Sequence, residues 1–151
     1  MTRSRLSTHE CTIAAVLFLL TFALYARTIG FDFVNFDDDQ YITENPRVTG
    51  GLSTRNIAWA FTTGYASNWH PLTWLSHQLD ATLFGPGPAG PHGINALLHA
   101  ANAALLFLAL RRLIERVETA SSPPAGLLAG LPEMGLILPA LAAGLFAWHP
   151  L

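Results

Sequence analysis

The chain has 151 residues, of which 51% are hydrophobic and only 12% are charged. A soluble domain has about 25% charged residues, so this composition favours an integral membrane protein. The net charge is −2, all eight cations are Arg and none of them forms a basic cluster, which argues against a nucleic-acid partner. The single cysteine, Cys11, cannot form a disulfide within the chain.

Residues 1–11 form a short polar tail, and the first apolar run follows directly. Residues 12–26 have the sequence TIAAVLFLLTFALYA, and extension to 12–29 gives a segment that can span a bilayer, which needs roughly 20 residues. A signal peptide is the alternative, because Arg3 and Arg5 form a basic region before the run. No small-x-small cleavage site precedes a clear polar stretch, so we favour a retained transmembrane helix.

Residues 30–92 form a polar loop in which two short helices are predicted. The first covers residues 55–62, where Ser53 or Thr54 can cap the helix and Gly64 can end it. The second begins at Pro71 and runs to about residue 84, because proline is favoured in the first turn of a helix.

The second loop helix has a one-sided apolar stripe of leucines spaced three and four apart, at Leu72, Leu75, Leu79 and Leu83. We expect the polar residues Thr73, His77 and Asp80 on the opposite side. Beside a membrane, such a helix would lie flat in the interface with Trp69 and Trp74 at headgroup depth. The alternative is that the leucine stripe packs on other parts of the loop.

Two further apolar segments follow the loop. Residues 93–110 contain no charge and end before Arg111 and Arg112, which predicts a second transmembrane helix. Residues 111–133 form a polar, proline-containing connection. A third helix is predicted from about residue 134 to 148, in a final segment of residues 134–151 that we expect to be truncated at Leu151.

The arginines predict the orientation of these segments. Arg3, Arg5, Arg111, Arg112 and Arg116 flank the predicted helices on one side, whereas the loop of residues 30–92 has two arginines and six acids. Because positive charge favours the cytoplasmic side, we expect the N-terminus in the cytoplasm and the loop in the periplasm or outside the cell. The expected location is the inner membrane of a bacterial cell.

The loop contains three adjacent carboxylates, Asp37, Asp38 and Asp39, just after the aromatic stretch FDFVNF. Close like charges and partial desolvation favour protonation, so one carboxylate could act as a general base on a hydroxyl. The same group could instead hold a divalent metal through oxygen ligands. A solvated acidic turn without chemistry remains the third interpretation.

Histidines give two weaker signals. His92, Asn95, His99 and Asn102 share one face of the second predicted transmembrane helix. Polar groups there either line a polar cavity or form hydrogen bonds between helices, and for His99 both remain open. His70 and His77 could bind a metal with Asp80, but this spacing is weak evidence for a metal site.

Four segments in order carry a resemblance: FVNFDDDQYITENPRV (33–48), GLSTRNIAWAFTT (51–63), NWHPLTWLSHQLDATLFG (68–85) and HGINALLHAANAALLF (92–107). Together they resemble the amino-terminal part of multi-pass glycosyltransferases of the GT-C superfamily, related to the tetratricopeptide-repeat O-mannosyltransferases. The resemblance implies an all-α membrane fold with two to three transmembrane helices here and short interfacial helices in the external loop. It also implies a reaction that moves a sugar, most simply mannose, from a polyprenyl-phosphate donor to a protein or glycan acceptor.

The resemblance also assigns roles to residues. Its acidic pair aligns with Asp37 and Asp38, shortly before Tyr41, so Asp37 would be the general base and Asp38 its supporting partner. Asp39 is the alternative for either role. Contacts with the acceptor or the lipid are expected from Trp69, His70, Trp74 and His99.

Members of this family have more transmembrane helices and commonly a repeat region, so we expect this chain to be an amino-terminal fragment that is too short to be active alone. One alternative is a non-catalytic small membrane subunit or scaffold whose loop binds an external partner. Another is a metal-binding membrane module that uses Asp37–Asp39 with His70 or His77.

Overall fold

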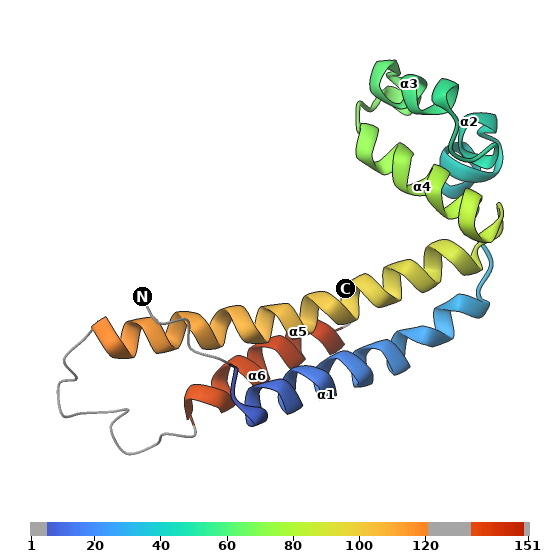
Figure 1. The fold of residues 1–151 in the computed structure, drawn as a ribbon. Coiled ribbons are helices and arrows are strands. Elements are labelled where there is room, and N and C mark those ends of the chain that lie inside the picture. Colours follow the sequence, from blue (N-terminus) through green and yellow to red (C-terminus); the bar gives the residue numbers. More distant parts are fainter. Residues whose placement is uncertain (1–5, 121–133, 150–151) are drawn as a thin grey trace. The chain divides into compact units, whose positions relative to one another are not determined.

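The computed structural model describes residues 6–120 and 134–149, and every regular element in these ranges is a helix (Figure 1). The chain divides into two compact units, which we call the bundle unit (Met1–Tyr25 and Ala96–Leu151) and the loop unit (Ala26–Asn95). The elements in chain order are α1 (Thr8–Tyr25), η1 (Ala26–Gly30), η2 (Asp39–Thr43), α2 (Pro46–Thr49), α3 (Thr54–Thr62), η3 (Tyr65–Ser67), α4 (Pro71–Phe84), α5 (Ala89–Ala120) and α6 (Met134–Trp148).

Helix α1 begins with a capping box. The Ser7 backbone N–H donates to the Glu10 carboxylate at 2.8 Å, and the Glu10 N–H donates to the Ser7 hydroxyl at 3.2 Å. These two bonds satisfy backbone donors that the first turn of a helix otherwise leaves free. The helix therefore begins four residues before the apolar run that predicted it.

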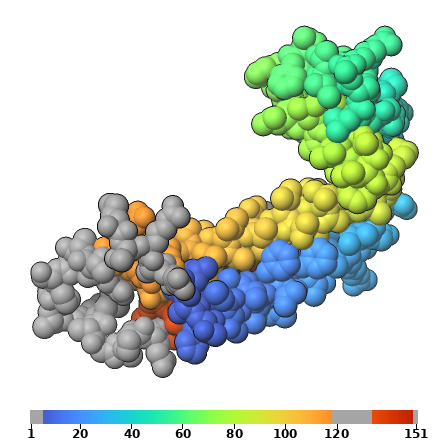
Figure 2. All heavy atoms as spheres, in the orientation of Figure 1, coloured from blue at the N-terminus to red at the C-terminus, as the bar shows by residue number. Residues whose placement is uncertain are grey.

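The core of the bundle unit is formed by α1, α5 and α6, which contribute Leu17, Phe107 and Ala143. Figures 1 and 2 show α1, in blue, running alongside α5, in yellow and orange. The faces buried in this unit consist mostly of small residues: Ala96, Ala100 and Ala103 on α5, and Gly135, Pro139, Ala143, Gly144 and Ala147 on α6. Small residues allow helix backbones to approach closely, as in membrane helix bundles.

An ion pair joins α1 to α5. The Arg111 Nε donates to Glu10 Oε1 at 3.1 Å, and the side chain of Glu10 is only 4% exposed. Because Glu10 lies at the start of α1 and Arg111 lies far along α5, the two helices run in opposite directions. The N-terminus of α1 and the Arg111 turn of α5 therefore lie at the same end of the bundle unit.

Two helices in the described part of the chain are long and apolar enough to cross a membrane, Thr8–Gly30 and Ala89–Val117. Helix α6 is apolar but has 15 residues, which is below the usual length of a span. These helices are consistent with a membrane location. A helix at 134–148 is confirmed, whereas its crossing of the bilayer remains a prediction.

Helix α5 is longer than the predicted span of residues 93–110. It begins at Ala89 and continues to Ala120, so residues 111–120 of the predicted connection are helical. Ion pairs from Arg111 and Arg112 to Glu115, at 3.1 and 2.7 Å, follow the i,i+4 and i,i+3 spacing that stabilises a helix. The charged residues that follow position 110 therefore end the apolar run, but the helical backbone of α5 continues through them. The rest of the predicted connection, residues 121–133, lies outside the described residues.

Both short helices predicted in the loop are confirmed, as α3 and α4. Ser53 is the N-cap of α3, and its hydroxyl accepts a hydrogen bond from the Asn56 backbone N–H at 3.1 Å. The core of the loop unit consists of Ile42, Val48, Ala60 and Trp74, so η2, α2, α3 and α4 all contribute to it.

Gly51 allows a close contact between the α2–α3 connection and α4. Its φ of +68° is rarely adopted by other residues, and a Cβ there would lie 2.6 Å from the Thr82 hydroxyl. The same hydroxyl accepts a hydrogen bond from the Leu52 N–H at 2.8 Å. A side chain at position 51 would therefore strain the backbone and push α4 away.

The leucine stripe of α4 faces outward within the loop unit. Leu72 is 76% exposed, Leu79 and Leu83 are also exposed, and Leu75 is half-buried. The alternative in which this stripe packs on other loop elements is therefore wrong for three of the four leucines. His77 and Asp80 lie on the side opposite the exposed leucines, as expected, and this side faces the core, because Asp80 is buried and His77 is half-buried.

Candidate functional site

The acidic segment lies at the start of a helical turn. Asn35 to Asp37 form a turn, Asp38 begins the helical backbone and η2 continues it with π-type hydrogen bonds. The backbone N–H of Tyr41 donates to the Asp37 carbonyl at 2.8 Å, and the N–H of Glu44 donates to the Asp39 carbonyl at 2.8 Å. These bonds fix the backbone around the three carboxylates.

The three carboxylates have different surroundings. Asp38 is half-buried, and its Oδ2 accepts a hydrogen bond from the Val34 backbone N–H at 2.8 Å. Asp39 is half-buried, and its Oδ1 accepts one from the Gln40 N–H at 2.8 Å. Asp37 is exposed, and within residues 6–120 and 134–149 its carboxylate accepts no hydrogen bond. Asp37 is therefore the carboxylate of the three with both oxygens accessible to a ligand.

An aromatic cluster lies directly after the acidic segment. The ring of Tyr41 stacks on Trp74 with centroids 5.2 Å apart and lies 5.5 Å from the ring of His70. His70 and Trp74 meet edge to face at 4.5 Å, and Trp59 adds a contact to Trp74 at 5.2 Å. Aromatic pairs at these separations stabilise a fold beyond the effect of their burial. The cluster therefore holds η2 firmly against the start of α4.

A strained turn precedes α4. Ala66 and Ser67 have φ angles of 55° and 61°, which are uncommon outside glycine. The next residue, Asn68, donates from Nδ2 to the Tyr41 hydroxyl at 2.6 Å, and Trp69 donates from Nε1 to the Phe61 carbonyl at 3.0 Å. Residues held in such conformations cost free energy and often occur at functional sites. This turn joins the predicted contact residues to the aromatic cluster.

A titratable pair, His77 and Asp80, lies one turn apart on α4. Burial raises the pKa of Asp80 above its ordinary value, and the charge of His77 opposes that shift. Burial lowers the pKa of His77, His70 adds to this shift, and the carboxylates of Asp80 and Asp38 oppose it.

The surroundings of this pair limit what it can bind. His77 and Asp80 line a cavity of about 10 Å³, which is too small for a sugar or a lipid headgroup. Among the residues that the structure describes, no group of three or more His, Cys, Asp or Glu side chains is arranged to hold a metal ion. The two metal sites that the sequence left open, one at His70, His77 and Asp80 and one at Asp37–Asp39, therefore gain no support from this geometry.

The structure brings some predicted contact residues together and separates others. Trp69 is 69% exposed, and His70 is half-buried beside Tyr41 in the same unit as the acidic segment. Trp74 has an exposed fraction of 0%, so the expectation that it lies at headgroup depth is wrong. Its large apolar ring is the centre of the loop core, and a contact with acceptor or lipid would require that core to open.

His99 belongs to the bundle unit. Its Nε2 lies 3.0 Å from the Ala147 carbonyl of α6, and its ring contacts Tyr25 of α1 at 4.8 Å and Phe146 of α6 at 5.3 Å. Of the two interpretations left open, this geometry favours hydrogen bonding between helices. Asn95 and Asn102, which were predicted on the same face, are both exposed.

Two structural roles were missed in the sequence. In the sequence, Tyr41 was used only to locate the acidic pair, yet in the structure it contacts His70, Trp74 and Asn68. The pairing of Glu10 with Arg111 joins residues about a hundred positions apart. The position of an aromatic residue just after three carboxylates could have indicated the first, but no local pattern indicates the second.

Comparison with curated proteins finds a relative that is similar to most of the chain. Over 106 residues the chain is 36% identical to the protein O-mannosyl-transferase Tmtc2 of Drosophila melanogaster. The match covers 65% of this chain and 11% of that relative, so the chain spans only a small part of its length. No model of a protein family and no solved structure matches the chain. The similarity favours a glycosyltransferase-like function.

Proposed function

We propose that this chain provides the acidic segment of a membrane glycosyltransferase that moves a sugar from a polyprenyl-phosphate donor to an acceptor hydroxyl. The observation that carries this proposal is the 36% identity with a protein named as an O-mannosyl-transferase. That name makes mannose the proposed sugar, and a protein or glycan the proposed acceptor. An exposed carboxylate in a helical unit between two apolar helices provides further support.

In the proposed reaction, Asp37 is the general base. One of its oxygens takes the proton of the acceptor hydroxyl while the hydroxyl oxygen attacks the anomeric carbon of the sugar. The bond from that carbon to the phosphate oxygen breaks, and polyprenyl phosphate leaves. The accessibility of Asp37 supports this role, because a base must come within hydrogen-bond reach of the proton it removes.

Asp38 is proposed as the supporting carboxylate. Its hydrogen bond from the Val34 N–H closes the turn that presents Asp37, so its role is to position the base. Asp39 makes the corresponding bond to Gln40 and is the alternative for either role. Trp69 and His70 are proposed to contact the acceptor or the lipid, since they lie in the same unit and have accessible surface.

The proposed topology places residues 12–29, 93–110 and 134–151 in the inner membrane, with the N-terminus in the cytoplasm and the loop outside. The pairing of Glu10 with Arg111 supports the placement of the start of α1 and the charged turn of α5 on one side. The arginines near these two segments support the cytoplasm as that side. The proposed partners are therefore membrane lipid, the lipid-linked donor and an external acceptor.

The test is sugar transfer by the full-length protein that contains this chain, measured with a radiolabelled polyprenyl-phosphate mannose and an acceptor peptide in detergent. We expect Asp37→Asn to lower the rate about 100-fold or more, because general base catalysis contributes about 10²–10⁴-fold. Asp32→Asn is the matched control, since Asp32 is exposed in the same segment and outside the acidic motif. Its rate should equal that of the unaltered protein.

Full activity of Asp37→Asn, with correct membrane insertion, would contradict the assignment of the base. Loss of activity in Asp38→Asn but not in Asp37→Asn would transfer the role of base to Asp38. If the unaltered protein transfers no sugar but co-purifies with a larger membrane enzyme, the scaffold alternative replaces this proposal.

A further inference from the structure

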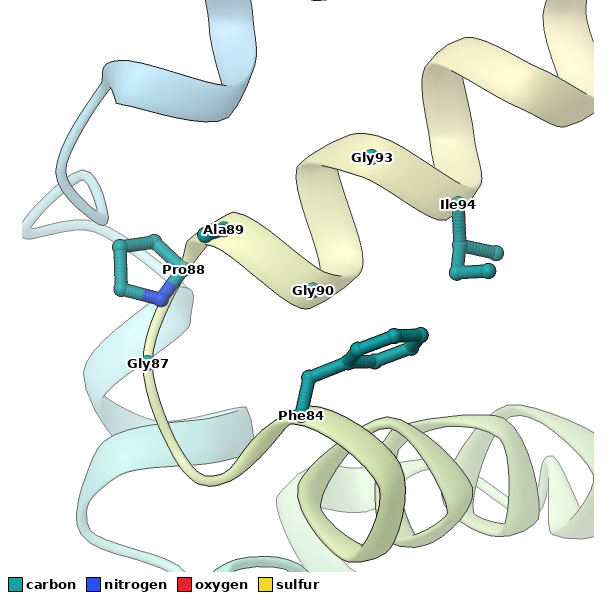
Figure 3. A pocket seen from close by; sticks show the side chains of 7 residues that line it. All are labelled: Phe84, Gly87, Pro88, Ala89, Gly90, Gly93 and Ile94. Carbon is teal, nitrogen blue, oxygen red and sulfur yellow. The ribbon is translucent and has the colours of Figure 1, made fainter.

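A pocket of about 460 Å³ lies between the end of α4 and the start of α5, within the loop unit (Figure 3). Three glycines, Gly87, Gly90 and Gly93, contribute bare backbone to its wall, and Phe84 and Ile94 contribute apolar side chains. In Figure 3 the side chain of Ile94 and the ring of Phe84 point toward the same space. The remaining lining residues are Pro88 and Ala89, so no charged side chain lines the pocket.

The glycines shape this pocket. A Cβ on Gly90 would lie 2.7 Å from the Phe84 Cβ, so the close contact of the two segments requires glycine there. By contrast, a Cβ on Gly87 would meet no atom within 4 Å, so this lining position has room for a side chain. The pocket therefore has one wall closed by tight packing and one position from which a side chain could fill it.

We propose that this pocket binds one acyl chain of a membrane phospholipid. The wall formed by Ala89, Gly90, Gly93 and Ile94 belongs to α5, whose residues 89–117 are long and apolar enough to cross a membrane. A pocket at the first turns of such a helix is within reach of lipid chains. The pocket surface is thus continuous along α5 with a surface that suits lipid.

The apolar lining of the pocket favours an acyl chain over a sugar or a peptide. A sugar or a peptide would bury hydroxyl or amide groups against Phe84, Ile94 and Pro88, whose side chains offer no hydrogen-bond partner. A hydrocarbon chain loses no hydrogen bond on entry and removes apolar surface from water. The exposed apolar side chains of Leu79, Leu83 and Phe84 at the end of α4 extend the same surface. This site is separate from the acidic segment, and its existence does not depend on the proposed transferase function.

The test is photolabelling of the full chain in vesicles of phosphatidylglycerol and phosphatidylethanolamine. The probe, added in trace amount, is a phosphatidylglycerol with a diazirine on one acyl chain. After irradiation, mass spectrometry of peptides locates the label. We expect labelling within residues 84–94, and Gly87→Leu should lower it roughly tenfold, which corresponds to the loss of burial of about two methylene groups. Gly64→Leu is the matched control, because a Cβ there also meets nothing within 4 Å and Gly64 is not among the pocket residues. Its labelling should be unchanged.

A second variant, Ala89→Leu, fills the pocket from the first residue of α5 and keeps the test valid if Gly87→Leu does not fold. Circular dichroism in the same vesicles identifies misfolded variants. Equal labelling of residues 84–94 in the pocket variants and the control would overturn the proposal. So would labelling of these residues by a diazirine-bearing polyprenol but not by the phospholipid, because the occupant would then be an isoprenoid chain. Sugar-transfer activity is not part of this test, so its result is independent of the catalytic proposal.

Discussion

Replacing Trp74 by Ala should destabilise the loop unit strongly, because this side chain has no exposed surface and contacts Tyr41, His70, Trp59 and Tyr65. An aromatic side chain buries about 150–250 Å². At about 25 cal/mol per Å², its removal costs roughly 4–6 kcal/mol. Substitutions of Phe or Trp by Ala in protein cores cost about 3–5 kcal/mol, so about 4 kcal/mol is expected here.

Hydrogen–deuterium exchange with mass spectrometry can measure this effect in the loop unit alone. Since about 1.4 kcal/mol corresponds to a factor of ten, protection of the α3 and α4 amides should fall by about three orders of magnitude. The amides of the bundle unit should be unaffected, because Trp74 belongs to the core of the loop unit.

Trp69→Ala is the matched control. Trp69 is 69% exposed, and its loss removes the hydrogen bond to the Phe61 carbonyl, which is worth about 1 kcal/mol. Protection should then fall only about fivefold. If the two variants lose equal protection, Trp74 is not the centre of the loop core and the reasoning from burial fails.

Two further predictions concern charged groups. Burial raises the pKa of Asp80 above its ordinary value of 3.8, so the stability that its neutral form contributes is present below that pH and is lost as the pH rises through the folded-state pKa. Asp80→Asn should therefore stabilise the loop unit at pH 7, as measured by hydrogen exchange. Because the Asp80 carboxylate raises the pKa of His77, the same variant should lower the pKa of His77 further in an NMR titration. A less stable variant, or an unchanged pKa of His77, would contradict this explanation. Arg111→Met should destabilise the bundle unit by about 2 kcal/mol in thermal unfolding, because the buried Glu10 carboxylate loses its hydrogen bond from Arg111 and keeps only its bond from the Ser7 N–H and the charge of Arg112. Arg112→Met is the control with a smaller expected loss, and equal losses would show that the link between α1 and α5 contributes little.

Local patterns in the sequence were sufficient for most helices. Ser53 before an apolar stretch and Pro71 at a first turn indicated α3 and α4, and the structure has both. Capping and proline placement act within one turn, so they can be recognised without knowledge of the rest of the chain. The extension of α5 to Ala120 was missed because an apolar run indicates where lipid can lie and not where backbone hydrogen bonds end.

The candidate site was only partly visible in the sequence. The three adjacent carboxylates indicated acid–base chemistry, but their spacing could not distinguish them, and the hydrogen bonds that leave Asp37 accessible are known only from the folded turn. The roles of Trp69 and Trp74 also could not be separated, since the burial of each ring depends on residues from other parts of the loop unit. One is exposed and the other is the centre of a core.

The sequence alone therefore determined the class of this protein: apolar helices, a polar loop and an acidic segment follow from composition, run length and turn chemistry, which act over a few neighbouring residues. Only the tertiary structure decided which face of α4 is buried, which partner Glu10 has and where a pocket forms beside Gly87. The reason is physical. Burial and pairing depend on residues that are distant in the chain, and both faces of α4 contain residues that could pack: leucines on one side, and tryptophan with polar partners on the other. Trp74, Gln78 and Asp80 are buried in the core, whereas Leu72, Leu79 and Leu83 are exposed.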